Sequence, residues 1–154
     1  MITVRHIEKT CLESEPFFKL CKKHASKLEK DLLIVFDLRI GCYGTHWFDS
    51  KKQLHIIRIS PEKCRHYRDE KGVIKKLDLE AEKYNIISTV VHEIRHAQQK
   101  EEMGISYWNK KCHYAEEIRN PGYKSYYSEI EADARTYENK YVLSAVEFYN
   151  SCVS

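Results

Sequence analysis

Two histidines in the segment VVHEIRHAQQ, residues 90–99, have a spacing that suits metal chemistry. Residues four apart in an α-helix lie one above the other on the same face, so His92 and His96 can share one ion. Glu93 follows the first histidine directly and can lean over the open coordination position to accept a proton from bound water. The pattern H-E-x-x-H therefore predicts two Zn²⁺ ligands and, in Glu93, a general base.

The residues around this motif favour metal binding over a position on the surface. A helix face that buries two imidazoles must satisfy their nitrogens, and a metal ion does so. The competing interpretation is a pair of surface histidines on an amphipathic helix. Apolar neighbours argue against it, namely Val90, Val91, Ile94 and Ala97.

A catalytic zinc site takes three protein ligands and leaves a fourth position for water, so the chain must supply one more ligand. The segment SEIEADA, residues 128–134, offers acidic candidates. Glu129 and Asp133 are four apart on one face of a predicted helix, and Glu131 lies between them on another face. His113, in KKCHYAEE, would instead complete a site of three histidines.

HEIRH followed by E-x-x-A-D resembles the motifs of gluzincin metallopeptidases. The local motif is similar to that of membrane-bound CAAX-prenyl endopeptidases. The chain is more similar to small zincin-like metallopeptidases encoded by phages and mobile elements, over about residues 85–140. This resemblance implies that Glu129 is the third zinc ligand. It also implies that Asp133 hydrogen-bonds the outer nitrogen of a zinc-binding histidine and fixes that ring.

Zincins often use a tyrosine or a histidine to stabilise the oxyanion of the tetrahedral transition state. The resemblance therefore implies that side chains within or just before the third-ligand segment are possible donors. Clustered tyrosines are, however, also ordinary helix-packing residues. These candidates are Tyr123, Tyr126, Tyr127 and His113.

The elements that must position these residues follow from periodicity and from local breakers. Apolar spacing predicts a first helix over 14–31, and β-branched residues predict a strand over 32–44. DSKKQ then predicts a hairpin loop before a returning strand, LHIIRIS, which is a candidate sheet edge for an extended peptide.

Two long helices are expected in the second half of the chain. The period of three and four predicts a helix over about 78–102, with Gly104 as its C-terminal cap. Loop signals fill 105–125, and a last helix is expected over about 126–150. The chemistry-bearing residues therefore lie mainly on these two helices.

Composition sets the class of protein. The 154 residues are 42% hydrophobic and 32% charged, which fits one globular domain spanning 1–154. The net charge of +3, with acids and bases interleaved, disfavours a nucleic-acid binder. The six cysteines form no C-x-x-C pair, and no signal peptide or long apolar run is visible, so we expect free thiols, no membrane span and a cytoplasmic location.

These observations predict an α+β, zincin-like single domain. We expect a small, mostly antiparallel sheet, an H-E-x-x-H helix that crosses it and a C-terminal helix that brings the third ligand. The expected function is that of a zinc metalloendopeptidase acting on a protein or peptide substrate. The alternative is a zinc-binding regulatory or protein-interaction module with the same fold and no turnover. A domain this small suggests a shallow cleft that suits one specific protein partner.

Overall fold

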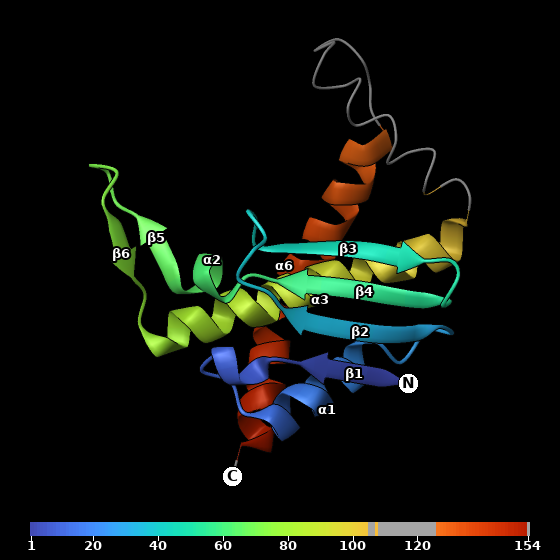
Figure 1. The fold of residues 1–154 in the computed structure, drawn as a ribbon, viewed down its shortest axis with the longest axis horizontal. Coiled ribbons are helices and arrows are strands. Elements are labelled where there is room, and N and C mark those ends of the chain that lie inside the picture. Colours follow the sequence, from blue (N-terminus) through green and yellow to red (C-terminus); the bar gives the residue numbers. More distant parts are fainter. Residues whose placement is uncertain (105–106, 108–125, 154) are drawn as a thin grey trace.

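The computed structural model describes residues 1–104, Tyr107 and residues 126–153, without the side chains of 126–128 (Figure 1). These residues form an α+β fold built on a four-stranded sheet with a separate two-stranded hairpin. The strands are β1 (Ile2–Arg5), β2 (Asp31–Phe36), β3 (Gly44–Asp49), β4 (Leu54–Ile59), β5 (His66–Arg68) and β6 (Ile74–Lys76). The helices are α1 (Ser14–His24), α2 (Pro61–Arg65), α3 (Leu79–Met103), α6 (Tyr126–Cys152) and the short 3₁₀ helix η1 (Ile7–Lys9).

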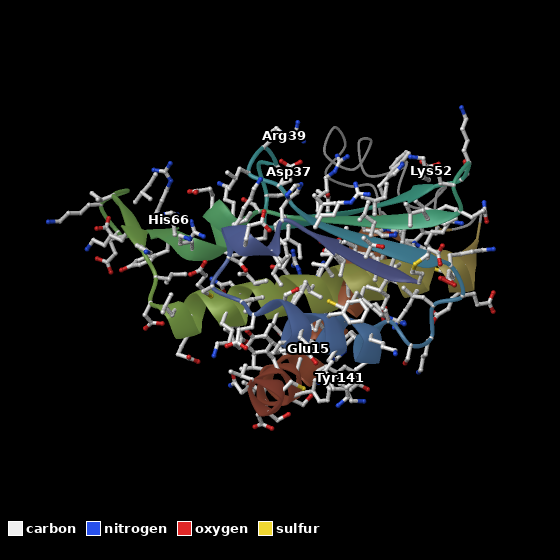
Figure 2. The ribbon with its side chains drawn as sticks, turned by 60° about the horizontal axis from the view of Figure 1, so that its bottom comes forward. Glu15, Asp37, Arg39, Lys52, His66 and Tyr141 are labelled. Carbon is white, nitrogen blue, oxygen red and sulfur yellow. The ribbon has the colours of Figure 1, made fainter. Side chains whose placement is uncertain are left out.

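One face of the sheet is buried against the helices. Alternate residues of β2 and β4 point into a core that also includes α1, α3 and the end of α6, and the rings of Phe17 and Phe36 pack 5.6 Å apart in it. Figure 2 shows the sheet on one side of the molecule and α6, marked by Tyr141, on the other. The hydroxyl of Tyr149 accepts a 2.7 Å hydrogen bond from the Glu13 amide and joins α6 to the start of α1.

The sheet is mixed, so the expectation of a mostly antiparallel sheet is wrong. Its strand order is β1-β2-β4-β3, in which β2 is parallel to both β1 and β4 and only β3 pairs antiparallel. The segment 32–44 is not one strand, because Asp37 accepts hydrogen bonds from the amide and the guanidinium of Arg39 and turns the chain out of the sheet. The chain returns at the far edge as β3.

The hairpin loop DSKKQ is confirmed, with β3 before it and β4 after it. The edge strands, however, are β1 and β3, whereas the returning strand β4 lies inside the sheet between β2 and β3. The returning strand, which the sequence offered as a candidate edge, is therefore not an edge strand of this sheet. The β3 edge of the sheet lies beside α3.

The predicted second helix is confirmed as α3, and its ends follow local rules. The side chain of Asp78 accepts a 2.8 Å hydrogen bond from the Ala81 amide and caps the first turn. Gly104 ends the helix with a φ of 58°, a backbone conformation that favours glycine. The first helix ends earlier than expected, at His24, whose carbonyl accepts a hydrogen bond from the Gln98 side chain of α3.

Two features bear on the environment of the chain. The five cysteines that the structure describes form no disulfide. Within the described ranges, no helix has both the length and the apolar character needed to cross a membrane.

Close approach of β3 to α3 requires a glycine. A Cβ placed on Gly44 would lie 2.5 Å from Cγ2 of Thr89 and 3.2 Å from Cγ of Glu93. Both of these residues lie on α3, so Gly44 sets the distance between the edge strand and the helix that carries the H-E-x-x-H motif.

Gly44→Ala is expected to lower the free energy of unfolding by about 1–3 kcal/mol, because its methyl group overpacks this contact. Thr89→Ser removes the clashing methyl group and should restore part of the loss in the double variant. Gly41→Ala is the matched control, since a Cβ there meets nothing within 4 Å. Chemical denaturation measures all four variants, and an equal effect at both glycines would contradict the close-packing argument.

Candidate metal centre

His92 and His96 lie on successive turns in the middle of α3. Their Nε2 atoms are 3.1 Å apart, and their rings meet edge to face with centroids 4.8 Å apart. His96 is buried and His92 is half-buried. The opposite side of this turn is anchored in the core, because Val90, Val91 and Ile94 are fully buried. The two imidazoles are thus directed to one point at the boundary of the core.

Glu131 of α6 meets both imidazoles. Its Oε1 lies 2.7 Å from Nε2 of His96, and its Oε2 lies 3.2 Å from Nε2 of His92. One ligand atom from each of the three residues falls within 4.8 Å of the others. In the part of the chain that the structure describes, this is the group whose chemistry could hold a metal ion. Two imidazole nitrogens and one carboxylate oxygen are a donor set that suits divalent transition metals.

The structure therefore replaces Glu129 by Glu131 as the candidate third ligand. Glu129 is exposed and is not part of the group. Two residues turn a helix by about 200°, so the two glutamates face opposite ways. Ile130 and Ala134 are the buried residues at this end of α6, and their burial turns Glu131 towards the histidines.

The resemblance implied that Asp133 hydrogen-bonds a zinc-binding histidine. In the structure, Asp133 bonds to Arg95 and Gln99 instead. Its Oδ2 accepts a 2.8 Å hydrogen bond from Arg95 Nε and a 2.7 Å hydrogen bond from Gln99 Nε2. Gln99 in turn accepts a 2.8 Å hydrogen bond from Nδ1 of His96 through Oε1. Asp133 therefore orients the amide that holds His96.

The outer nitrogens of both imidazoles have acceptors, which sequence reasoning missed. Nδ1 of His96 meets Gln99, and Nδ1 of His92 lies 3.1 Å from Oε1 of Glu138. A proton on each Nδ1 leaves the Nε2 lone pairs to face the shared point. Helical spacing could have identified both partners, because Gln99 follows His96 by three positions and Glu138 follows Glu131 by seven.

Charge is strongly coupled within this cluster. Burial disfavours the charged form of His92, but hydrogen bonds to Glu131 and Glu138 outweigh it and raise the pKa of His92 to about 10. Burial also acts to raise the pKa of Glu131, whereas hydrogen bonds from the two histidines hold it well below its usual range. In the metal-free protein, a proton on His92 thus takes the place that a cation would occupy.

A cavity of about 920 Å³ opens over the cluster. It is bordered by the start of β3 and the loop before it, by α3 and by α6. Glu93 lines the same cavity as the two histidines and Glu131, although its side chain is only 7% exposed. The predicted base and the candidate ligands therefore share one space.

A series of hydrogen-bonded polar side chains extends inward from the wall of this cavity. His46 of β3 lines the cavity, and its Nε2 lies 2.9 Å from Nδ1 of His55, which is fully buried. Nε2 of His55 lies 2.9 Å from Oε2 of Glu101 near the end of α3. Burial lowers the pKa of His55 below its ordinary value, which Glu101 opposes. No sequence motif indicated this series, since His55 and Glu101 are 46 positions apart, on β4 and α3.

The predicted oxyanion donors lie outside the described residues. This applies to His113 and Tyr123 and to the side chains of Tyr126 and Tyr127. Tyr107, which the sequence did not single out, lines the cavity, and its ring lies edge-on to that of His46 at 6.1 Å.

Comparison of the chain with models of protein families, with curated proteins and with solved structures finds no match. The assignment of this site therefore depends on its own geometry and chemistry.

Replacing the candidate third ligand should abolish metal binding. Glu131→Gln is expected to weaken metal affinity by at least about 100-fold, because a neutral amide is a poor ligand. Glu129→Gln is the matched control on the same helix and should keep the wild-type metal content. Elemental mass spectrometry on both purified variants measures the difference, and loss of metal in Glu129→Gln alone would restore the original assignment.

Metal affinity should rise with pH. Below about pH 10 the raised pKa keeps His92 protonated in the metal-free protein, so an ion must displace that proton. Glu131 stays ionised throughout, and the apparent affinity should therefore increase about tenfold per pH unit between about pH 6 and pH 8. Competition with a calibrated chelator measures this slope. A flat profile would show that metal binding displaces no proton from His92.

Proposed function

We propose that this protein is a zinc-dependent metallopeptidase. The observation that carries the proposal is the convergence of His92, His96 and Glu131 within 4.8 Å in a cavity that Glu93 also lines. A set of two histidines and one glutamate is typical of catalytic zinc, because it leaves a coordination position open. The acceptors on both outer imidazole nitrogens support a site with fixed ligand orientation.

The chain's own residues suit peptide hydrolysis. Zinc held by the three ligands would supply Lewis acidity that activates water and polarises a peptide carbonyl. Glu93 follows His92 on the same helix, so it is positioned to accept a proton at its carboxylate and return it to the leaving amine. Its low exposure keeps competing solvent away from that carboxylate.

The sheet edge offers a way to hold an extended substrate. β3 is an edge strand, and its first residues, Gly44 to His46, line the cavity beside the candidate ligands. A peptide that adds to this edge would be bound by main-chain hydrogen bonds. Because Gly44 brings β3 close to Glu93, such a peptide would lie within reach of the base.

The proposal is tested with Glu93→Gln, which keeps the shape of the side chain and removes its basicity. We expect unchanged zinc content and a loss of at least about 100-fold in kcat/KM, the usual contribution of a general base. The assay incubates wild type and variant with a defined pool of peptides from digested proteins and scores new termini by mass spectrometry. Glu129→Gln serves as the exposed carboxylate control.

Three outcomes would overturn this function in different ways. Stoichiometric zinc without any new peptide termini would favour the alternative, a zinc-binding module that acts through a partner. Cleavage that survives in Glu93→Gln would remove Glu93 from the reaction and would point to a contaminating protease. Absence of bound zinc after reconstitution would remove both functions.

A further inference from the structure

Arg135 is the one lysine or arginine among the described residues that line the cavity. It lies on α6 one helical turn after Glu131. Three carboxylates line the same cavity, those of Glu93, Glu131 and Glu138. A single guanidinium in this setting decides whether the cavity can accept an anionic group.

The usual partners of Arg135 are already engaged. Glu131 lies four residues before it and Glu138 three residues after it, spacings at which helical ion pairs form. Both carboxylates are instead bonded to imidazoles at distances of 2.7–3.2 Å, Glu131 to His92 and His96 and Glu138 to His92. Arg135 makes no hydrogen bond or ion pair with any residue that the structure describes, and its side chain is exposed.

A second arginine close by shows the contrast. Arg95 of α3 donates to Asp133 at 2.8 Å and to Glu102 at 3.3 Å, so its charge is used in joining the helices. Arg135 has no such contact with the described residues. No described residue uses its five N–H groups, which form a fork that matches the two oxygens of a carboxylate.

The charge of the occupied site points the same way. A divalent ion at the ligands together with Arg135 would balance the three lining carboxylates. Without the guanidinium the cavity would be net negative and would repel an anionic substrate. Among the described residues that line the cavity, Arg135 is therefore the one whose charge favours an anionic group.

We propose that Arg135 is a specificity-determining residue that binds a carboxylate of the substrate peptide beside the bond to be cleaved. The inference rests on the proposed function and deepens it, since it gives the substrate an acidic side chain or a free C-terminal carboxylate at that position. Both sources present the same chemistry to the guanidinium. The preferred geometry is a pair of parallel N–H···O bonds.

The test uses peptide hydroxamates, whose chelating group anchors them at the metal without turnover. One pair carries Glu or Gln next to the hydroxamate, and a second pair ends there in a free or an amidated C-terminus. Calorimetry on the zinc-loaded wild type should show about tenfold tighter binding of the carboxylate member of one pair. The pair that responds identifies the source of the carboxylate.

Arg135→Glu is the informative variant, because its exposed position leaves the core unaltered. The preference should disappear or invert in Arg135→Glu, with unchanged zinc content. Lys140→Glu is the matched control: it makes the same charge change on the same helix at an exposed residue that does not line the cavity, and it should keep the preference.

The result that overturns the inference is a binding ratio near one in wild type for both pairs, or a ratio that Arg135→Glu leaves unchanged. Failure of the proposed function has a different signature. Zinc-loaded protein that binds the hydroxamates with the expected preference but cleaves no peptide would refute the peptidase and retain the carboxylate site. Protein that takes up no zinc would overturn both.

Discussion

The joint between α3 and α6 at Gln99 is the interaction on which the site depends. The side chain is only 3% exposed and uses its whole amide. Nε2 donates to the carbonyl of Ile130 at 3.0 Å and to Asp133 at 2.7 Å, while Oε1 accepts from His96. One buried residue thus fixes both the rotation of α6 and the orientation of a candidate ligand. Glu131 faces the histidines because this joint and the burial of Ile130 fix the rotation of α6 about its own axis.

Local features of the chain could be predicted from the sequence because their causes are local. Asp78 and Gly104 mark the two ends of α3 by capping rules that involve only near neighbours. The spacing of H-E-x-x-H alone places its two histidines on one face of a helix. The choice among the acids of SEIEADA could not be made in this way. Positions 129, 131 and 133 are all acidic, and only the packing of α6 on α3 selects between them.

The sheet was harder to predict for the same reason. The hairpin of β3 and β4 follows from its turn, but the parallel pairing of β2 with β4 requires the chain to leave the sheet at Asp37. That exit depends on one short-range interaction with Arg39 inside an apolar segment. The parallel pairing of β1 with β2 joins residues about 30 positions apart, which no local pattern encodes.

These constraints together define the candidate function. α3 supplies two candidate ligands and the proposed base, α6 supplies the candidate third ligand and a guanidinium that no described residue pairs with, and β3 supplies a wall that can pair with an extended chain. Each contribution comes from a different element, so the site exists only in the folded protein. Its proposed preference for a carboxylate and its proposed zinc chemistry draw on different residues and are separable.

The hydrogen bonds that connect Glu101, His55 and His46 also have a fixed donor-to-acceptor direction. An ionised carboxylate can only accept, so Nε2 of His55 must carry the proton that it donates to Glu101. With its pKa lowered by burial, His55 is neutral near neutral pH, and its Nδ1 must then accept from Nε2 of His46. One half-buried carboxylate therefore sets the tautomers of two buried rings in turn. Glu101 does not line the cavity and lies near the other end of β4, yet it sets the direction of the hydrogen bonds in the cavity wall at His46.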